Sequence, residues 1–210
     1  MVRRKAEAER REAIIAATIE EIGARGTLDV TVSQIARRAR ISPALAHHYF
    51  GSKESLLLAA MRQILRDYGA AVRRELARAG RPRTRLSAII RASFGPEHFR
   101  PGKVAAWLNF YVLARSNPAA AALLALYHRR LRSNLLHDLR PLTAEDAPAA
   151  ADLIAALIDG LYLRQALGPG EIDPGAAIAL IEAEIDRLTA APPALASTLA
   201  PPLAKETSDG

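Results

Sequence analysis

The chain has 210 residues, of which half are apolar, no cysteine and a formal net charge of +7. The apolar share is large enough to form a buried core, and the lack of cysteine excludes disulfide scaffolds, thiol catalysis and cysteine-ligated zinc. No apolar run reaches the roughly 18 residues of a membrane span, and the charged first twelve residues do not resemble a signal peptide. We therefore expect a cytoplasmic protein with no membrane partner.

The positive charge is unevenly distributed along the chain. Residues 1–60 carry a net charge of +3 and residues 61–100 a net charge of +7, whereas residues 101–210 carry −3. This asymmetry favours a polyanion, such as nucleic acid, as a partner of the first half only. The alternative is that the abundant arginine reflects only the base composition of the coding sequence.

Signals for helix starts recur along the chain, whereas the alternating patterns typical of strands are scarce. Thr31 precedes Gln34 by three residues, the spacing of a capping box in which each side chain pairs with the other residue's free backbone N–H. Further N-cap candidates, three of which precede a proline suited to the first helical turn, are Ser42, Ser52, Asn117, Thr143 and Asp173.

These signals predict an all-α protein. Prolines 82, 96, 101, 141 and 169 are expected between helices, because proline breaks the backbone hydrogen bonding of a helix interior. The predicted helices run near 7–25, 32–39, 43–50, 53–79, 84–94, 103–115, 118–139, 144–167 and 174–190.

The two short helices near residues 32–39 and 43–50 have the layout of a helix-turn-helix. Their inward faces would hold Val32, Ile35, Ala36, Ile41, Leu45 and Phe50. The second helix of such a motif enters the major groove of DNA, where short polar side chains contact base edges. The side chains expected to face outward are those of Ser42, Ala44, His47 and His48.

The segments IARRARIS and HYFGSKESLL resemble the DNA-binding region of TetR-type transcriptional regulators over about 60 residues. Two positions depart from the usual pattern. Arg40 stands where the family most often has glycine, and a positive φ there would cost roughly 1 kcal/mol. His47 stands where many members have a tyrosine that contacts phosphate, and a histidine can still donate a hydrogen bond there.

The resemblance assigns roles to residues around the turn. Candidate phosphate contacts are Thr31, Ser42 and Lys53. Candidate base contacts are Ser42, Pro43, Ala44, His47 and His48. Arg37 and Arg38 could reach the DNA backbone or could form a solvated helix face. Tyr49 belongs to the same DNA-binding set, although Tyr49 and Phe50 are better interpreted as wedges against neighbouring helices. The adjacent histidines point to different sides of a helix, which excludes a shared zinc ion.

Three aromatic side chains are grouped on one predicted helix of the second half. Trp107, Phe110 and Tyr111 stand at i, i+3 and i+4 and therefore share a helix face. They could form part of the core, or an aromatic cage, whose electron-rich ring faces hold a quaternary ammonium ion. Phe94, Phe99, Tyr68 and Tyr162 could add further rings.

The segments AWLNFY, YHRRLRSNLLHDLR and ALIDGLYLRQAL resemble the C-terminal domain of BetI-type repressors, which respond to choline. The ligand-binding residues that the resemblance implies are Trp107, Phe110, Tyr111, Asp159 and Tyr162. Asp159 could balance the choline cation, or it could pair with an arginine at position 129, 132 or 164. Gly160, inside a helix, is expected to permit a close helix crossing.

The resemblance implies a repressor of genes for choline uptake and glycine betaine synthesis. We expect residues 1–55 to form a helix-turn-helix domain, residues 56–191 a ligand-binding and dimerisation domain, and residues 192–210 a disordered tail. Two copies would pair through the last two helices, whose apolar faces carry Leu153, Leu157, Leu161, Ile178, Ile181, Ile185 and Leu188.

Two alternatives to this function remain. One is a TetR-type regulator with an unrelated effector. The other is a helical enzyme, which is disfavoured because no Ser/His/Asp arrangement, phosphate-binding loop or metal-ligand spacing occurs in the sequence. We accordingly expect no cofactor and no metal.

Overall fold

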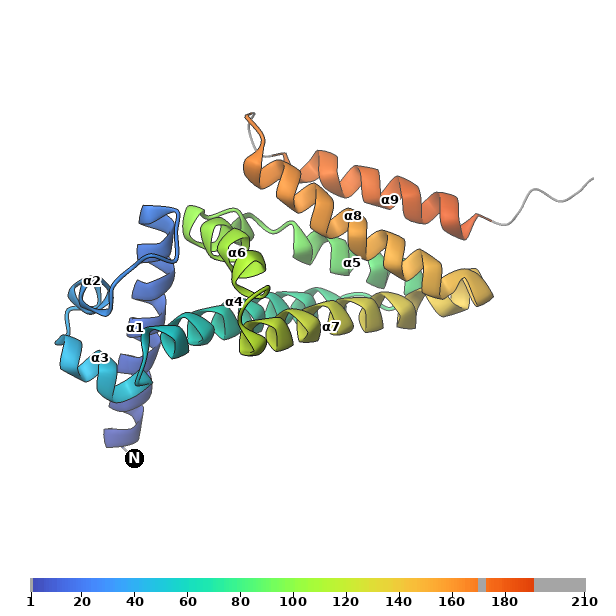
Figure 1. Cartoon of the computed structure of the whole chain (residues 1–210). Coiled ribbons are helices and arrows are strands. Elements are labelled where there is room, and N and C mark those ends of the chain that lie inside the picture. The colour runs from blue at the N-terminus through green and yellow to red at the C-terminus, as the bar shows by residue number, and fades with distance from the viewer. Residues whose placement is uncertain (1, 170–172, 191–210) are drawn as a thin grey trace, which may run out of the picture.

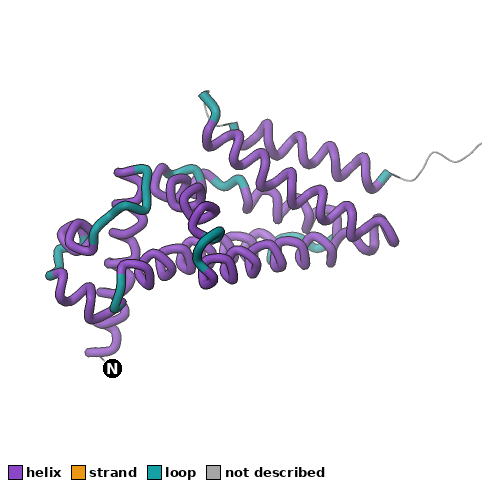
Figure 2. The backbone as a smooth tube through the Cα atoms, in the orientation of Figure 1, coloured by secondary structure: helices purple, strands orange, loops and turns teal. Residues whose placement is uncertain are grey.

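The computed structural model describes residues 2–169 and 173–190, and side chains from residue 5 onward. This part of the chain is helical and contains no strand, which confirms the all-α prediction (Figure 2). The helices are α1 (Val2–Arg25), α2 (Val32–Arg38), α3 (Pro43–Phe50), α4 (Lys53–Leu76), α5 (Pro82–Ser93), α6 (Pro101–Leu113), α7 (Pro118–Thr143), α8 (Ala147–Leu167) and α9 (Pro174–Thr189). Short 3-10 turns cover Pro96–His98 and Ala144–Asp146. The predicted tail lies outside the described residues.

The helices form two groups that share α4 (Figure 1). Helices α1 to α3 cluster at one end, and α1 packs against both α4 and α6. Helices α4 and α7 lie side by side along the length of the molecule. Helices α8 and α9 form a pair that packs on α7 through α8 and lies away from α1 to α3. Within the described ranges, no helix combines the length and apolarity needed to cross a membrane.

Most helix starts follow from the capping residues in the sequence. The capping box at Thr31 is confirmed, because Gln34 N–H donates to Thr31 Oγ1 at 3.2 Å and Thr31 N–H donates to Gln34 Oε1 at 2.7 Å. The other side chains that cap as predicted are those of Ser42, Ser52, Asn117 and Asp173.

Helix boundaries near prolines differ from the prediction. Pro82 and Pro101 lie at the first residue of α5 and α6 rather than before those helices, because proline suits that position. Pro141 lies inside the last turn of α7, where only one backbone N–H is lost. The predicted cap at Thr143 is wrong: its hydroxyl donates back to the Leu139 carbonyl at 3.2 Å.

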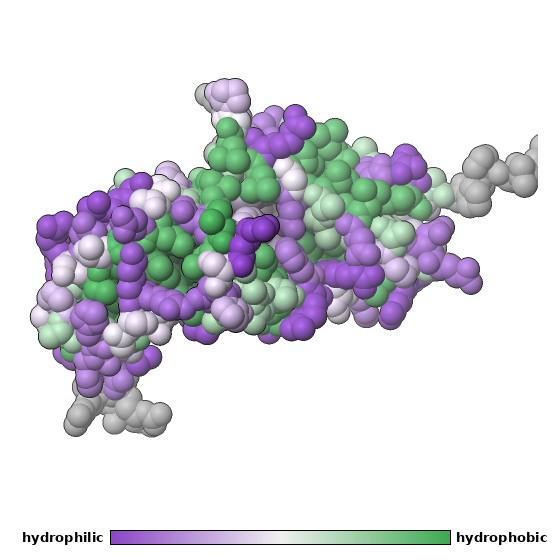
Figure 3. All heavy atoms as spheres, viewed as in Figure 1, coloured by the Kyte–Doolittle hydropathy of each residue, from purple (hydrophilic) through white to green (hydrophobic). Residues whose placement is uncertain are grey.

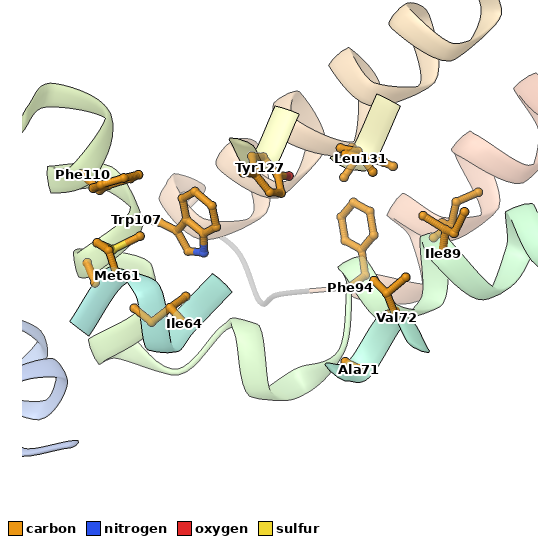
Figure 4. Close-up of a cluster of buried hydrophobic side chains, with 14 of the residues drawn as sticks. Met61, Ile64, Ala71, Val72, Ile89, Phe94, Trp107, Phe110, Tyr127 and Leu131 are labelled. Carbon is orange, nitrogen blue, oxygen red and sulfur yellow. The ribbon is translucent and has the colours of Figure 1, made fainter. Parts of the chain in front are cut away.

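The core continues from the helix-turn-helix into the larger group of helices. In Figure 4, Met61 and Ile64 of α4 lie beside Trp107 and Phe110 of α6. Further along the molecule, α4, α5 and α7 bury a second stretch of the same core, which includes Val72, Ile89, Phe94 and Leu131. The apolar periodicity of α4 therefore joins the two groups into one packed body.

Helices α1 and α6 cross at two glycines. A Cβ atom added to Gly23 would lie 2.3 Å from Gly102 Cα, and one added to Gly102 would lie 2.8 Å from the Ile19 carbonyl oxygen. Neither position has room for a side chain, because the opposing atoms are backbone. The contact brings the start of α6 directly against α1.

Candidate functional site

Helix α3 presents one exposed face to solvent. Its neighbour α2 buries Ile35 and Ala36, and α3 itself buries Ala46. The exposed side chains on and before α3 are those of Ser42, Pro43, Ala44, His47 and His48. The structure therefore brings the five predicted base-contact residues together on an outward surface.

The turn between α2 and α3 is a Schellman motif. Arg40 N–H donates to the Arg37 carbonyl at 3.1 Å, and Ile41 N–H donates to the Ala36 carbonyl at 3.0 Å. Arg40 has a φ of +55°, in the left-handed region that favours glycine. Arg40, which stands where the family most often has glycine, therefore occupies a position whose backbone has a positive φ.

The two arginines of α2 have different environments. Arg38 Nε donates to Glu21 Oε2 at 2.6 Å, and Arg25 Nε donates to Glu21 Oε1 at 2.9 Å. These two guanidinium groups lower the pKa of the buried Glu21 carboxyl. Arg37 is exposed and forms no ion pair with any described residue. Arg38 is thus engaged within the protein, and Arg37 faces outward.

The aromatic pair at the end of α3 packs against α1. The guanidinium carbon of Arg11 lies 5.5 Å from the ring centres of both Tyr49 and Phe50. Arg11 Nη2 also donates to the Tyr49 carbonyl at 2.9 Å. This arrangement favours the interpretation of Tyr49 and Phe50 as wedges that hold α3 in place.

The two remaining candidate phosphate contacts lie at the starts of α2 and α4. Thr31 is exposed and caps α2. Lys53 is the first residue of α4, and its Nζ lies 3.6 Å from a carboxylate oxygen of the exposed Asp29. A surface pair of this kind is weak, so Lys53 can exchange its partner for a phosphate.

A small cavity of about 30 Å³ lies among α4 to α8. Five helices and the 3-10 turn at Pro96–His98 contribute to its wall, which is mainly aromatic. The lining residues are Tyr68, Ser93, His98, Trp107, Tyr111, Tyr127, Ile158, Asp159 and Tyr162. Four of the five predicted ligand residues therefore meet at one cavity.

Trp107 stands among the other rings of this cavity. Its ring centre lies 5.7 Å from that of Tyr111 and 5.1 Å from that of Tyr127. Phe110, the fifth predicted ligand residue, does not line the cavity, and its placement there is corrected. Its side chain is fully buried in the core, with its ring centre 6.2 Å from that of Trp107.

Asp159 is the carboxylate of the cavity. The Tyr127 hydroxyl donates to Asp159 Oδ1 at 2.8 Å, and His128 Nε2 lies 3.6 Å from Oδ2. Burial raises the pKa of the Asp159 carboxyl, because the charged form loses hydration. Among the described residues no arginine pairs with Asp159, and Arg132 instead pairs with Asp152. The arginine-paired alternative is therefore wrong.

Sequence reasoning did not assign Ser93, His98 or Tyr127 to the site and counted Tyr68 only as a further ring. Burial raises the pKa of Tyr68 to about 12, and its hydroxyl lies 3.0 Å from Ser93 Oγ. Burial also lowers the pKa of His98, whose Nε2 has no hydrogen-bond partner in the described structure. The signal in the sequence that could have indicated Tyr127 is the segment YHRRLRSNLLHDLR, which begins with this residue.

The close helix crossing expected at Gly160 does not occur within this chain. A Cβ atom added there would meet nothing within 4 Å, so no helix of the same chain crosses at this glycine. The close crossing occurs instead at Gly23 and Gly102. Spacing within α8 alone could not reveal this, because the crossing depends on how distant helices pack.

Two family models match separate parts of the chain. Residues 14–60 match the model described as bacterial regulatory proteins of the tetR family. Residues 82–190 match the model described as BetI-type transcriptional repressor, C-terminal. The first match contains the helix-turn-helix, and the second contains all cavity residues except Tyr68.

Relatives and solved structures agree with these matches. The HTH-type transcriptional regulator BetI of Rhizobium meliloti is 51% identical over 177 residues, covering 82% of this chain and 86% of that protein. A putative transcriptional regulator from Pseudomonas aeruginosa PAO1 is 29% identical with a TM-score of 0.72, covering 87% and 91% of the two chains. One from Saccharomonospora viridis, in complex with choline, is 23% identical with a TM-score of 0.77, covering 85% and 96%.

Proposed function

Because this chain belongs to the TetR family of bacterial regulatory proteins and to its BetI-type branch, we propose that it is a repressor that choline releases from an operator. The genes under its control would serve choline uptake and glycine betaine synthesis. The relatives that it matches are transcriptional regulators and not enzymes.

The observation that carries the choline assignment is a half-buried carboxylate within an aromatic cavity. The rings of Trp107, Tyr111 and Tyr127 offer electron-rich faces to a quaternary ammonium ion, which has no N–H to donate. Asp159 supplies the balancing negative charge, and Tyr162 extends the aromatic wall. Choline held by the Saccharomonospora viridis regulator of the same fold supports the assignment.

The cavity must expand to take this ligand. Its volume of about 30 Å³ suits a water molecule, and a trimethylammonium group is several times bulkier. Expansion moves wall residues such as Tyr68 on α4 and Trp107 on α6, and both helices contact α1. Choline would favour the expanded state and thereby reorient the helix-turn-helix.

DNA binding would use the exposed face of α3 in the major groove. Ser42, Ala44, His47 and His48 would contact base edges, and Pro43 would pack against them. Phosphate contacts would come from Thr31, Arg37 and Lys53 around this face. Residues 1–55 would act as the DNA-binding domain and residues 56–191 as the ligand-binding and dimerisation domain.

A homodimer would double the number of base contacts. The outward face of α8 and α9 is rich in alanine, and green atoms cover part of it in Figure 3. On this face Leu153 and Leu180 are 40% and 61% exposed. Two of the predicted pairing residues, Ile181 and Ile185, are instead buried within the chain's own core.

The proposal is tested by operator release. A duplex selected from a random library by the purified protein is titrated with choline, betaine aldehyde, glycine betaine and the neutral isostere of choline that has carbon in place of nitrogen. We expect release by choline and none by the isostere, since Asp159 and the rings require a cation. Release by unrelated neutral compounds alone would assign the alternative function, a TetR-type regulator with another effector.

A further inference from the structure

A second and much larger opening lies between α4 and α7. Its volume is about 600 Å³, within the usual range for small-molecule sites, whereas the aromatic cavity holds about 30 Å³. Tyr68 and Tyr127 line both spaces and separate one from the other. We call the larger space the α4–α7 groove.

The floor of the α4–α7 groove is apolar. Side chains from α4 and α7 line it, and the leucines at positions 65, 76, 123 and 126 are only partly buried by the protein itself, whereas Val72 and Leu131 are buried. The apolar lining includes Leu65, Val72, Leu76, Leu123, Leu126 and Leu131. An apolar ligand body of several methylene groups would remove this surface from water.

The wall of the groove also carries four arginines. Arg62, Arg66 and Arg73 project from α4, and Arg130 projects from α7. No acidic side chain of the described residues lines the groove, and none of these four arginines forms an ion pair there. Within the described ranges, Arg66 donates side-chain hydrogen bonds only to Gln63 Oε1. Four like charges around one opening attract an anion.

The nearest acidic residue in sequence does not neutralise these arginines. Asp67 accepts a hydrogen bond from Gln63 at 2.7 Å and lies 4.0 Å from Lys103 Nζ. The groove therefore differs in charge from the aromatic cavity, where Asp159 lies. A quaternary ammonium ion would be repelled at the arginine-lined wall, so the groove and the cavity suit ligands of opposite charge.

We propose that the α4–α7 groove is a second ligand site, which binds a free acidic amphiphile with an apolar chain and a carboxylate head. The chain would lie on the leucines, and the carboxylate would accept hydrogen bonds from Arg66 and Arg130. This site goes beyond the choline response, since its arginines and leucines lie outside the aromatic cavity and the bound carboxylate would not contact Asp159.

Calorimetric titration of the purified full chain with decanoate, below its micelle concentration, tests the site. We expect saturable binding to the natural chain and at least tenfold weaker binding to the Arg66→Gln/Arg130→Gln variant. The matched control is Arg91→Gln/Arg115→Gln, which removes the same charge from exposed positions outside the groove and should bind as the natural chain does. Thermal unfolding of both variants checks that they are folded.

Titrations with a second ligand and a third variant test where decanoate binds and which of its groups is recognised. Decanol should bind at least tenfold more weakly than decanoate, and Asp159→Asn should bind decanoate as the natural chain does. Equal binding of decanol, equal loss in both arginine variants, or loss in Asp159→Asn would overturn the proposal. Binding only to phosphatidylglycerol vesicles would also overturn it and would indicate a membrane surface as the partner. Binding of decanoate only to the Leu180→Glu variant, in which pairing is disrupted, would likewise overturn it and would indicate that a second copy covers the groove.

Discussion

At the residue scale, the turn of the helix-turn-helix holds an arginine in a conformation that glycine adopts at no steric cost. Arg40 closes a Schellman motif at a φ of +55°. We expect Arg40→Gly to raise the free energy of unfolding by about 1 kcal/mol. Urea denaturation measures the change.

The matched control for this substitution lies three residues earlier. Arg37 is also exposed but has helical geometry in α2. Arg37→Gly should lower the free energy of unfolding by about 1 kcal/mol, because glycine is unfavourable inside a helix. If Arg40→Gly destabilised the protein as much as Arg37→Gly, no strain would be present at the turn.

A second residue-scale prediction concerns pH and Asp159. Burial raises the pKa of this carboxyl, and a bound cation favours its ionised form. Below that pKa, choline must displace a proton, so its affinity should fall as the pH falls, by up to about tenfold per unit. Titrations of choline from about pH 4, the ordinary pKa of an aspartate, up to neutral pH measure the slope.

Two variants locate the origin of this slope. Asp159→Asn should bind choline more weakly at neutral pH and with little pH dependence. His128 Nε2 lies 3.6 Å from the same carboxylate, so His128→Gln serves as the control and should retain the slope. A full slope in Asp159→Asn would remove this residue from the ligand site.

Local chemistry explains which residues could be predicted from the sequence. The cap at Thr31 involves a partner three residues away, so spacing alone reveals it. Trp107, Phe110 and Tyr111 share one helix face, and spacing cannot show that Phe110 faces the core while the other two face the cavity. That division depends on the angle between α6 and α4. The partner of Asp159 likewise comes from another helix.

At the element scale, the crossing of α1 and α6 sets the distance between the helix-turn-helix and the cavity. Gly23→Ala would place a Cβ atom 2.3 Å from Gly102 Cα, where backbone cannot yield cheaply. We expect the free energy of unfolding to fall by about 1–3 kcal/mol, the usual cost of overpacking. Thermal or urea unfolding measures this loss.

The same substitution elsewhere provides the comparison. A Cβ atom at Gly80 would meet nothing within 4 Å, and Gly80 has no positive φ, so Gly80→Ala should be neutral or slightly stabilising. Equal stability of the two variants would show that α1 can shift away from α6.

The helices themselves could be predicted from periodicity and capping residues. The crossing of α1 and α6 could not, because it joins residues 79 positions apart and leaves no local signal in the sequence.

At the scale of the whole molecule, the outward face of α8 and α9 is the surface through which we propose that two copies pair. Leu180→Glu places a charge on this face and should convert a dimer to a monomer with much weaker operator binding. Val112→Glu, at a side chain that is 70% exposed on α6, should leave the dimer intact. Sedimentation measures both, and a dimeric Leu180→Glu variant would exclude this pairing surface.

Operator affinity should also fall steeply with salt, because basic side chains displace counterions from DNA. Lys53→Ala should reduce the steepness of log affinity against log salt concentration by about 0.9, which is the contribution of one phosphate contact. Arg140→Ala, at an exposed arginine in the last turn of α7, which lies at the opposite end of the molecule from α3 (Figure 1), should leave the slope unchanged. A salt-independent affinity of the natural chain would contradict DNA binding through phosphates. The positive charge of the first half of the sequence predicted a polyanion as partner. The exposed face of α3 indicates where DNA would dock.

The placement of Trp107 has a practical consequence. It is the single tryptophan of the chain, and its ring lies at the wall of the aromatic cavity, 5.1 Å from Tyr127. Its fluorescence therefore originates where the cation would sit and changes when the surrounding rings move apart. The molecule carries its own optical reporter, so occupancy of the cavity can be followed without a label while DNA is present.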